Sequence, residues 1–191
     1  GLLFCDPSLF EYSVVGGHAI LTRYIGVDKR VVVPAQLGGL LVAAVGEHAF
    51  SSSPVESVTV SNGVLRIDDG AFTACAMLRE VILPHSITRI GDNAFFDCGN
   101  LSSVRFSEGL IEIGDNAFGY DRALASVRLP ETLQTLGKSA FEGCTGLTAV
   151  ELPGRISVLP EAAFYYCDHL ASLSFAEGLV DIGDRALEGC V

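Results

Sequence analysis

Apolar positions return along the chain at a fixed spacing. Phenylalanine occupies Phe50, Phe72, Phe95, Phe118, Phe141 and Phe164, with Leu187 in the next position, and after a first gap of 22 residues every gap is 23. Five units of 23 residues and a last one of 22 therefore run from 55 to 191, and residues 31–54 form a looser seventh. A catalytic motif is needed once, whereas a unit that stacks on copies of itself is rewritten at every level. The pattern predicts a repeat array.

Two apolar patterns within each unit predict a flattened coil. In the unit that begins at Leu101, Val104 and Phe106 alternate with polar residues, which is the period of a short strand with one buried face. A Pro or Gly then turns the chain, and a second apolar pair, Leu110 and Ile113, supplies another wall of the core. Because one coil cannot bury its own apolar edges, we expect neighbouring coils to stack with parallel strands about 4.8 Å apart.

The letters IGDNAF begin with the last residue of the second apolar pair and occur twice, at Ile90 and Ile113. Asp at this position can accept backbone N–H groups at the start of a short helical turn, Ala permits close approach, and Phe fills the interior. A length of 23 residues is too short for a parallel strand pair with a full crossover helix. We therefore predict an α/β repeat solenoid of right-handed coils, with short parallel strands on one face and loops or single helical turns on the other.

The repeated pattern LxxVxLPxxLxxIGxxAFxxC, over residues 31–191, resembles the BspA-like leucine-rich repeat family of bacterial surface proteins. The stretch that precedes the first full unit resembles the two-stranded lead-in common before such repeats. The chain departs from the pattern at Asp121, Pro160 and Leu187, where Cys, Gly and Phe are expected. The resemblance implies a leucine-rich repeat superhelix. It also implies a division into an N-terminal β-rich cap, residues 1–30, and one continuous array, residues 31–191.

Composition narrows the possible partners. With 191 residues, 49% hydrophobic and 18% charged, the chain can bury a large core. Its most apolar run, residues 37–46, is about half of the ~20 residues that a membrane helix needs, so we expect no membrane insertion. A formal charge of -11 argues against nucleic acid, which binds mainly through Lys and Arg. The start shows no signal-peptide pattern and no initiator Met, which suggests a trimmed or mature fragment.

Cysteine recurs three residues after the Phe position, at Cys75, Cys98, Cys144, Cys167 and Cys190, with Ser53 and Asp121 in the two unmatched units. These spacings lack the CxxC or Cys/His clusters of a zinc site. Stacked, parallel Cβ vectors also suit a disulfide poorly. We therefore favour a column of reduced, buried thiols over pairing or metal binding. Cys5 is an isolated thiol whose fate stays open.

Carboxylates occupy one position of the repeat, at Glu47, Asp69, Asp92, Asp115, Glu161 and Asp184, interrupted by Lys138. Calcium requires several oxygens that converge on one point, whereas each coil offers a single carboxylate here. Capping of the helical turn explains the same residues, and we favour it over a metal site.

The chain shows no catalytic constellation. His18, His48, His85 and His169 lie at different positions of the repeat, so stacking brings no two of them together. GxSxG, HExxH, phosphate-loop and dinucleotide-binding patterns are also absent from the sequence. We therefore predict no enzymatic activity and no cofactor.

The remaining candidate for a functional site is the extended surface that the strands form. The predicted binding residues point outward between buried strand residues, at Thr59, Ile82, Arg105, Arg128, Glu151 and Ser174. Arg105 and Arg128 should be neighbours, which requires an anion or a carboxylate such as Glu151 beside them. The alternative is that these are ordinary solvated strand residues. Aromatic residues after the Phe position, Phe96, Tyr120, Tyr165 and Tyr166, are a second candidate, although they can also pack between coils.

The resemblance implies a non-catalytic adhesion module of a bacterial cell-surface or secreted protein, whose partner is a protein or glycan on host or neighbouring cells. Two alternatives stay open: an architectural spacer that presents other domains, and an accessory domain of a larger surface enzyme. Val180 and Ile182 continue the repeat as if another coil followed. We therefore expect the native chain to continue, or the uncapped C-terminal end to self-associate.

Overall fold

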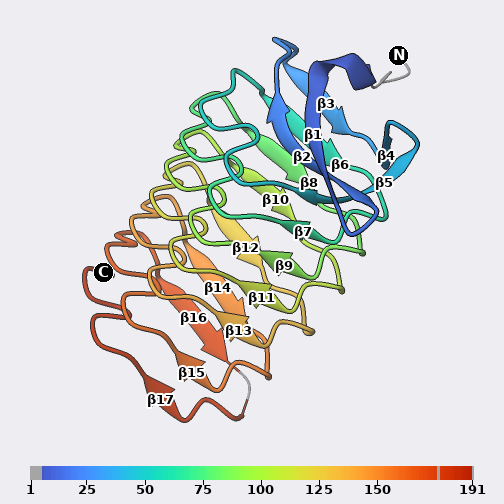
Figure 1. Ribbon diagram of the computed structural model, residues 1–191. Coiled ribbons are helices and arrows are strands. Elements are labelled where there is room, and N and C mark those ends of the chain that lie inside the picture. The colour runs from blue at the N-terminus through green and yellow to red at the C-terminus, as the bar shows by residue number, and fades with distance from the viewer. Residues whose placement is uncertain (1–5, 176, 191) are drawn as a thin grey trace.

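The computed structural model describes residues 6–175 and 177–190, which form a solenoid of about seven coils with its two ends far apart (Figure 1). The strands of the first face are β3 (Arg30–Val33), β6 (Ser57–Val60), β8 (Glu80–Ile82), β10 (Ser103–Arg105), β12 (Ser126–Arg128), β14 (Ala149–Leu152) and β16 (Ser172–Phe175). Those of the second face are β5 (Leu40–Val45), β7 (Arg66–Ile67), β9 (Arg89–Ile90), β11 (Glu112–Ile113), β13 (Thr135–Leu136), β15 (Val158–Leu159) and β17 (Asp181–Ile182). Parallel pairing within each face confirms the predicted stacking.

The third edge of each coil consists of turns, which agrees with the predicted loops, and the predicted alternative of single helical turns is not confirmed. In the described chain the only helix is the 3-10 helix η1 (Pro7–Leu9). On the third edge the Phe95 N–H donates to the Ala117 carbonyl of the next coil at 2.8 Å, and Asn93 and Asp97 donate to that coil in the same way. Asn93 and Asp97 have positive φ angles of 54° and 58°, which a continuous helix forbids. The turns thereby form a third hydrogen-bonded ladder along the solenoid.

A column of stacked phenylalanine rings fills the centre of the solenoid, as predicted. The ring centroids are 4.8 Å apart between Phe50 and Phe72 and 5.5 Å apart between Phe141 and Phe164, with nearly parallel planes. These side chains are among the largest that are fully buried in the molecule. Because aromatic side chains bury the most apolar surface of any residue, this column dominates the core.

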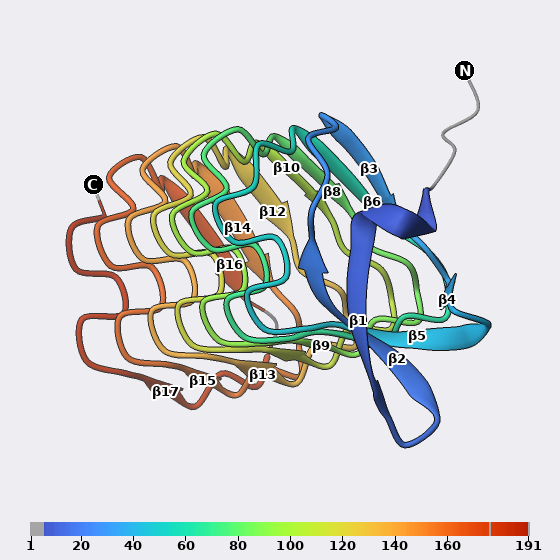
Figure 2. The same ribbon diagram turned by 45° about the horizontal axis from the view of Figure 1, so that its top comes forward.

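The N-terminal segment packs on the first coil. β1 (Phe10–Val15) pairs antiparallel with β2 (His18–Tyr24), which pairs parallel with β5, while β4 (Gln36–Leu37) forms a short antiparallel pair with β5. Tyr24 stacks on Phe50 at 5.0 Å and therefore extends the aromatic column toward the N-terminal end. Figure 2 shows this hairpin at one end of the stack of coils. At the other end Val180 and Ile182 are 79% and 53% exposed. Cys5 lies outside the described residues.

The repeated glycine is required by close packing between coils. A Cβ atom on Gly114 would lie 2.7 Å from the backbone nitrogen of Asp92, closer than real Cβ contacts allow. The φ angle at Gly114 is not positive, so conformational freedom is not the reason for this glycine. Pro160 takes the equivalent position two coils later and has no N–H to donate. The Gly114 N–H donates to Ile90 at 2.9 Å, and at Pro160 the pairing of the second face is interrupted between β13 and β15.

Candidate binding surface

The structure places all six predicted binding residues on the first face, in two groups of three. Thr59, Ile82 and Arg105 are register partners on β6, β8 and β10. Arg128, Glu151 and Ser174 are register partners on β12, β14 and β16. Thr59 and Ile82 are half-buried, and the other four side chains are exposed. We call these six residues the first-face column.

The two groups are separated by an interruption in the sheet. β10 and β12 follow each other in the stack but are not hydrogen-bonded to each other. Contrary to expectation, Arg105 and Arg128 are therefore not register partners. Both arginines nevertheless line one open depression, together with Val104, Phe106 and Pro130. Phe106 occupies the position that Leu83 and Leu129 hold in neighbouring coils, and its ring meets Phe118 edge-on at 5.6 Å.

The two arginines differ in their carboxylate partners. Arg105 places Nη2 3.5 Å from Oε1 of Glu80, an exposed pair of the kind that contributes little to stability. Glu151 is the register partner of Arg128, but no ion pair joins Arg128 to any residue in the described part of the chain. Glu151 therefore lies beside Arg128, as expected, but its carboxylate is not within 4 Å of the guanidinium. Of the two arginines in the first-face column, Arg128 is the one that forms no ion pair with a described residue.

The second face also carries an ordered set of charges, which the sequence analysis did not identify. Arg66 Nε lies 2.7 Å from Asp68 Oδ1, and Arg89 bridges Glu112 at 3.3 Å and Asp69 at 3.6 Å. These groups satisfy one another. The second apolar pair of each unit could have indicated this second strand. We interpreted that pair only as a wall of the core and did not assign the polar residues beside it to a strand. Because the charges are paired internally, this face offers fewer free groups to a partner.

The cysteine column is present as predicted. Cys75, Cys98, Cys144 and Cys167 are buried, Cys190 is half-buried, and all five are free. Each thiol donates to the carbonyl of a phenylalanine in the preceding coil at 3.0 to 3.3 Å. Burial raises the pKa of the Cys144 thiol well above its usual value and that of Cys167 to about 12. Cys144 and Cys167 are therefore poor nucleophiles, which fits a structural role for these two thiols.

The acidic column binds backbone groups of the next coil, so the predicted capping of its own turn is wrong. Asp69 Oδ1 accepts the Asp92 N–H at 3.0 Å, Asp92 accepts from Asp115 at 2.8 Å, and Asp115 accepts from Lys138 at 2.7 Å. The cause is the turn geometry of the third edge, which directs N–H groups along the solenoid axis. Over residues 6–175 and 177–190 no group of three His, Cys, Asp or Glu side chains is placed to hold a metal ion.

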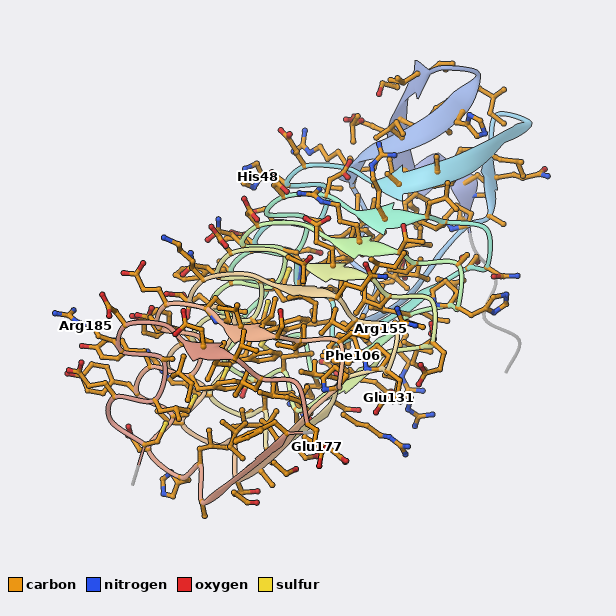
Figure 3. The ribbon with its side chains drawn as sticks, turned by 90° about the horizontal axis from the view of Figure 1, so that it is seen from below. His48, Phe106, Glu131, Arg155, Glu177 and Arg185 are labelled. Carbon is orange, nitrogen blue, oxygen red and sulfur yellow. The ribbon has the colours of Figure 1, made fainter. Side chains whose placement is uncertain are left out.

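Of the aromatic residues after the Phe position, Phe96 and Tyr120 pack between coils, whereas Tyr166 is 52% exposed. Tyr120 meets Phe96 edge-on at 5.5 Å and donates its hydroxyl to Glu142 Oε1 at 2.7 Å. A Cβ atom on Gly143 would lie 2.7 Å from the Tyr120 ring, so this glycine makes room for the tyrosine. Figure 3 shows that His48 and Arg185 lie on this turn edge, on the opposite side of the molecule from Phe106. The aromatic row is therefore separate from the first-face column.

Comparison with known proteins agrees with this architecture. The family model for the BspA type leucine rich repeat region matches in six copies, over residues 43–167 and 89–191. The Treponema pallidum leucine-rich repeat protein TpLRR has a TM-score of 0.90 and 30% identity, covering 96% of this chain and 87% of that chain. No curated protein matches.

Two further solved structures share the fold at lower identity. A leucine rich cell surface protein of Faecalibacterium prausnitzii has a TM-score of 0.84 and 24% identity, covering 98% of this chain but 52% of that chain. The pneumococcal vaccine antigen PcpA has a TM-score of 0.59 and 20% identity, covering 98% of this chain and 68% of that chain.

None of the helices among the described residues has the length and apolarity to cross a membrane. The family model matches most of the coils, and the chain therefore belongs to the BspA type leucine-rich repeat family.

Proposed function

We propose that this chain is a non-catalytic protein-binding module of a bacterial cell-surface or secreted protein, and that it binds through the first-face column. The observation that carries the proposal is the arrangement of that column: exposed Arg, Glu and Ser side chains stand on consecutive, mostly paired parallel strands. The description of the F. prausnitzii relative as a cell surface protein supports the location. The absence of a catalytic constellation in the sequence agrees with a binding role.

The scaffold favours binding because it holds the column in place. The strands of each group are hydrogen-bonded to one another, and the stacked phenylalanine core lies behind them. Side chains on a rigid support lose less freedom on association than side chains on loops, so more of the contact energy appears as affinity. Residues 31–191 act in this proposal as one continuous array, and residues 1–30 act as its N-terminal cap.

The charge of the protein indicates which partners to test first. A net charge of -11 repels polyphosphates, whereas the two arginines of the column attract carboxylates on a protein or glycan. We propose that the partner is such a molecule on host or neighbouring cells, outside the bacterium. Self-association through the exposed Val180 end is a separate property, which light scattering at increasing protein concentration would detect.

A matched pair of surface variants tests the proposal. The first-face variant combines Arg105→Glu, Arg128→Glu and Glu151→Arg, and the control combines Gln134→Glu and Thr135→Glu on the second face, so that both change the net charge by about two units. Fluorescent full-length chains are then added to epithelial cells and to bacterial cells in a flow cytometer. We expect the first-face variant to lose at least about tenfold in binding and the control to bind normally.

Two results would overturn the proposal. If wild-type chain binds neither cell type, the repeat array acts as a spacer that presents other domains. If both variants lose binding equally, overall charge and not the first face governs the interaction. Thermal unfolding of each variant, followed by circular dichroism, establishes beforehand that all three proteins are folded.

A further inference from the structure

The interruption between β10 and β12 leaves backbone hydrogen-bonding groups without strand partners. At the preceding step of the first face the Ser103 N–H donates to the Arg79 carbonyl at 3.1 Å. The equivalent bond, from Ser126 to Ser102, is not formed, and both residues lie within the described chain. Unpaired backbone groups at such an edge are available to an incoming ligand. At all the remaining steps of the first face, from β3 to β10 and from β12 to β16, neighbouring strands are hydrogen-bonded.

The same interruption exposes part of the apolar core. Val104 and Phe106 are half-buried, whereas their equivalents one coil earlier, Val81 and Leu83, are only 0% and 5% exposed. Figure 3 shows Phe106 near Arg155 and Glu131 and apart from His48 and Arg185 on the turn edge. The depression between the strands therefore has an apolar floor, which favours a ligand with an apolar group at this point.

The charged residues around the depression leave one guanidinium without an ion pair to a described residue. Arg105 and Arg128 stand on its two sides, but Arg105 is already shared with Glu80. Glu108 also lines the depression and repels a second negative charge. Arg128 is left to receive a partner, and a guanidinium binds a carboxylate through two parallel hydrogen bonds. One carboxylate fits this arrangement, whereas a phosphate with two charges or a polyanion does not.

We propose that the depression between β10 and β12 binds one acidic side chain, Glu or Asp, from an extended segment of the partner protein, next to an apolar residue that covers Phe106. The inference rests on the proposed function and names the partner chemistry for one part of the first-face column. Arg128 holds the carboxylate. An extended segment suits the site because it places side chains two residues apart on the same side, so that one can reach Arg128 while another covers Phe106.

Three pentapeptides test the proposal by NMR titration of the full chain labelled with 15N. They are acetyl-Val-Leu-Glu-Leu-Val-amide, the same peptide with Gln in place of Glu, and the Gln peptide with a free C-terminal carboxylate. We expect the Glu peptide to shift amide signals of β10 and β12, and the Gln amide to bind at least about tenfold more weakly. The peptide with the free C-terminus should be equally weak.

Variants of the protein test whether Arg128 is the residue that binds the carboxylate of the peptide. Arg128→Gln should weaken the Glu peptide by about tenfold, Arg128→Lys should weaken it less, and Arg23→Gln, an exposed arginine of β2, should leave it unchanged. Equal affinity for all peptides, shifts outside β10 and β12, or an unaffected Arg128→Gln variant would each refute the inference, as would stronger binding of the free C-terminus. If the cell-binding loss of the first-face variant still held, only this inference and not the proposed function would fall.

Discussion

The Cys98 backbone N–H donates to Asp121 Oδ1 at 2.8 Å inside the core of the solenoid. Asp121 stands in the cysteine column and is fully buried, and its second oxygen, Oδ2, has no hydrogen-bond partner. Burial, reinforced by the charge of Asp97, raises the pKa of Asp121 well above its usual value, although the Cys98 N–H acts in the opposite direction. The carboxyl group therefore keeps its proton to a higher pH than an exposed aspartate does.

Replacing Asp121 with the cysteine of the other coils should stabilise the protein, and more so as pH rises. Above the ordinary pKa of 3.8 the unfolded chain loses the Asp121 proton while the folded chain retains it, so the free energy of unfolding falls with pH until the raised folded pKa is passed. We expect Asp121→Cys to gain about 1–3 kcal/mol at pH 7 and much less at pH 4. Urea unfolding at both pH values measures the difference.

The control for this effect is Glu131→Gln, which removes one negative charge from an exposed residue that does not contribute to the raised pKa of Asp121. It should change stability by no more than about 0.5 kcal/mol, because surface substitutions rarely do more. A gain for Asp121→Cys that is independent of pH would show that the carboxyl group does not titrate differently in the folded state.

The buried thiols should be protected from reagents in the folded protein. In a Cys5→Ser background, a colorimetric thiol reagent should react readily with at most the half-buried Cys190, because Cys75, Cys98, Cys144 and Cys167 are buried. Adding guanidinium chloride should release the remaining groups. Equal reactive counts before and after unfolding would contradict the buried column.

The acidic column should act through backbone hydrogen bonds and not through metal. Asp92→Ala removes the acceptor of the Asp115 N–H and should cost about 1–2 kcal/mol, whereas Asp92→Asn keeps an oxygen at that position and should cost less. Because no ion joins the coils in this account, millimolar calcium should leave the melting temperature unchanged. A calcium-dependent rise that Asp92→Asn abolishes would instead establish a metal site.

The glycine of the repeat should tolerate no side chain where coils approach closely. Gly114→Ala would press its Cβ against the backbone of the preceding coil, so we expect a loss of about 3 kcal/mol or more. Gly99→Ala is the matched control, since a Cβ there meets nothing within 4 Å. Denaturant titrations of both variants compare the two sites. Similar stabilities would show that the coils can move apart at little cost.

The six central strand residues could be assigned to one face from the sequence, but the gap within that face could not. Alternation of apolar and polar residues places Arg105 and Arg128 on the same side of their strands in any parallel stack. The residue types at this step do not announce the gap, because Phe175 occupies the Phe106 position in β16 and that strand still pairs with β14. The spacing of two strands is set by packing across coils, which no single repeat contains.

The sequence by itself determined the period, the stacking and the core of this protein, because a spacing of 23 residues and the position of Phe95 in each unit are one-dimensional properties that stacking converts directly into a column. Tertiary structure decided the rest. The third edge became a ladder of turns because N–H groups such as that of Phe95 find acceptors in the next coil. Asp92 binds the Asp115 N–H, and not one of its own turn, for the same reason. Hydrogen-bond partners across coils are set by geometry that no single repeat contains.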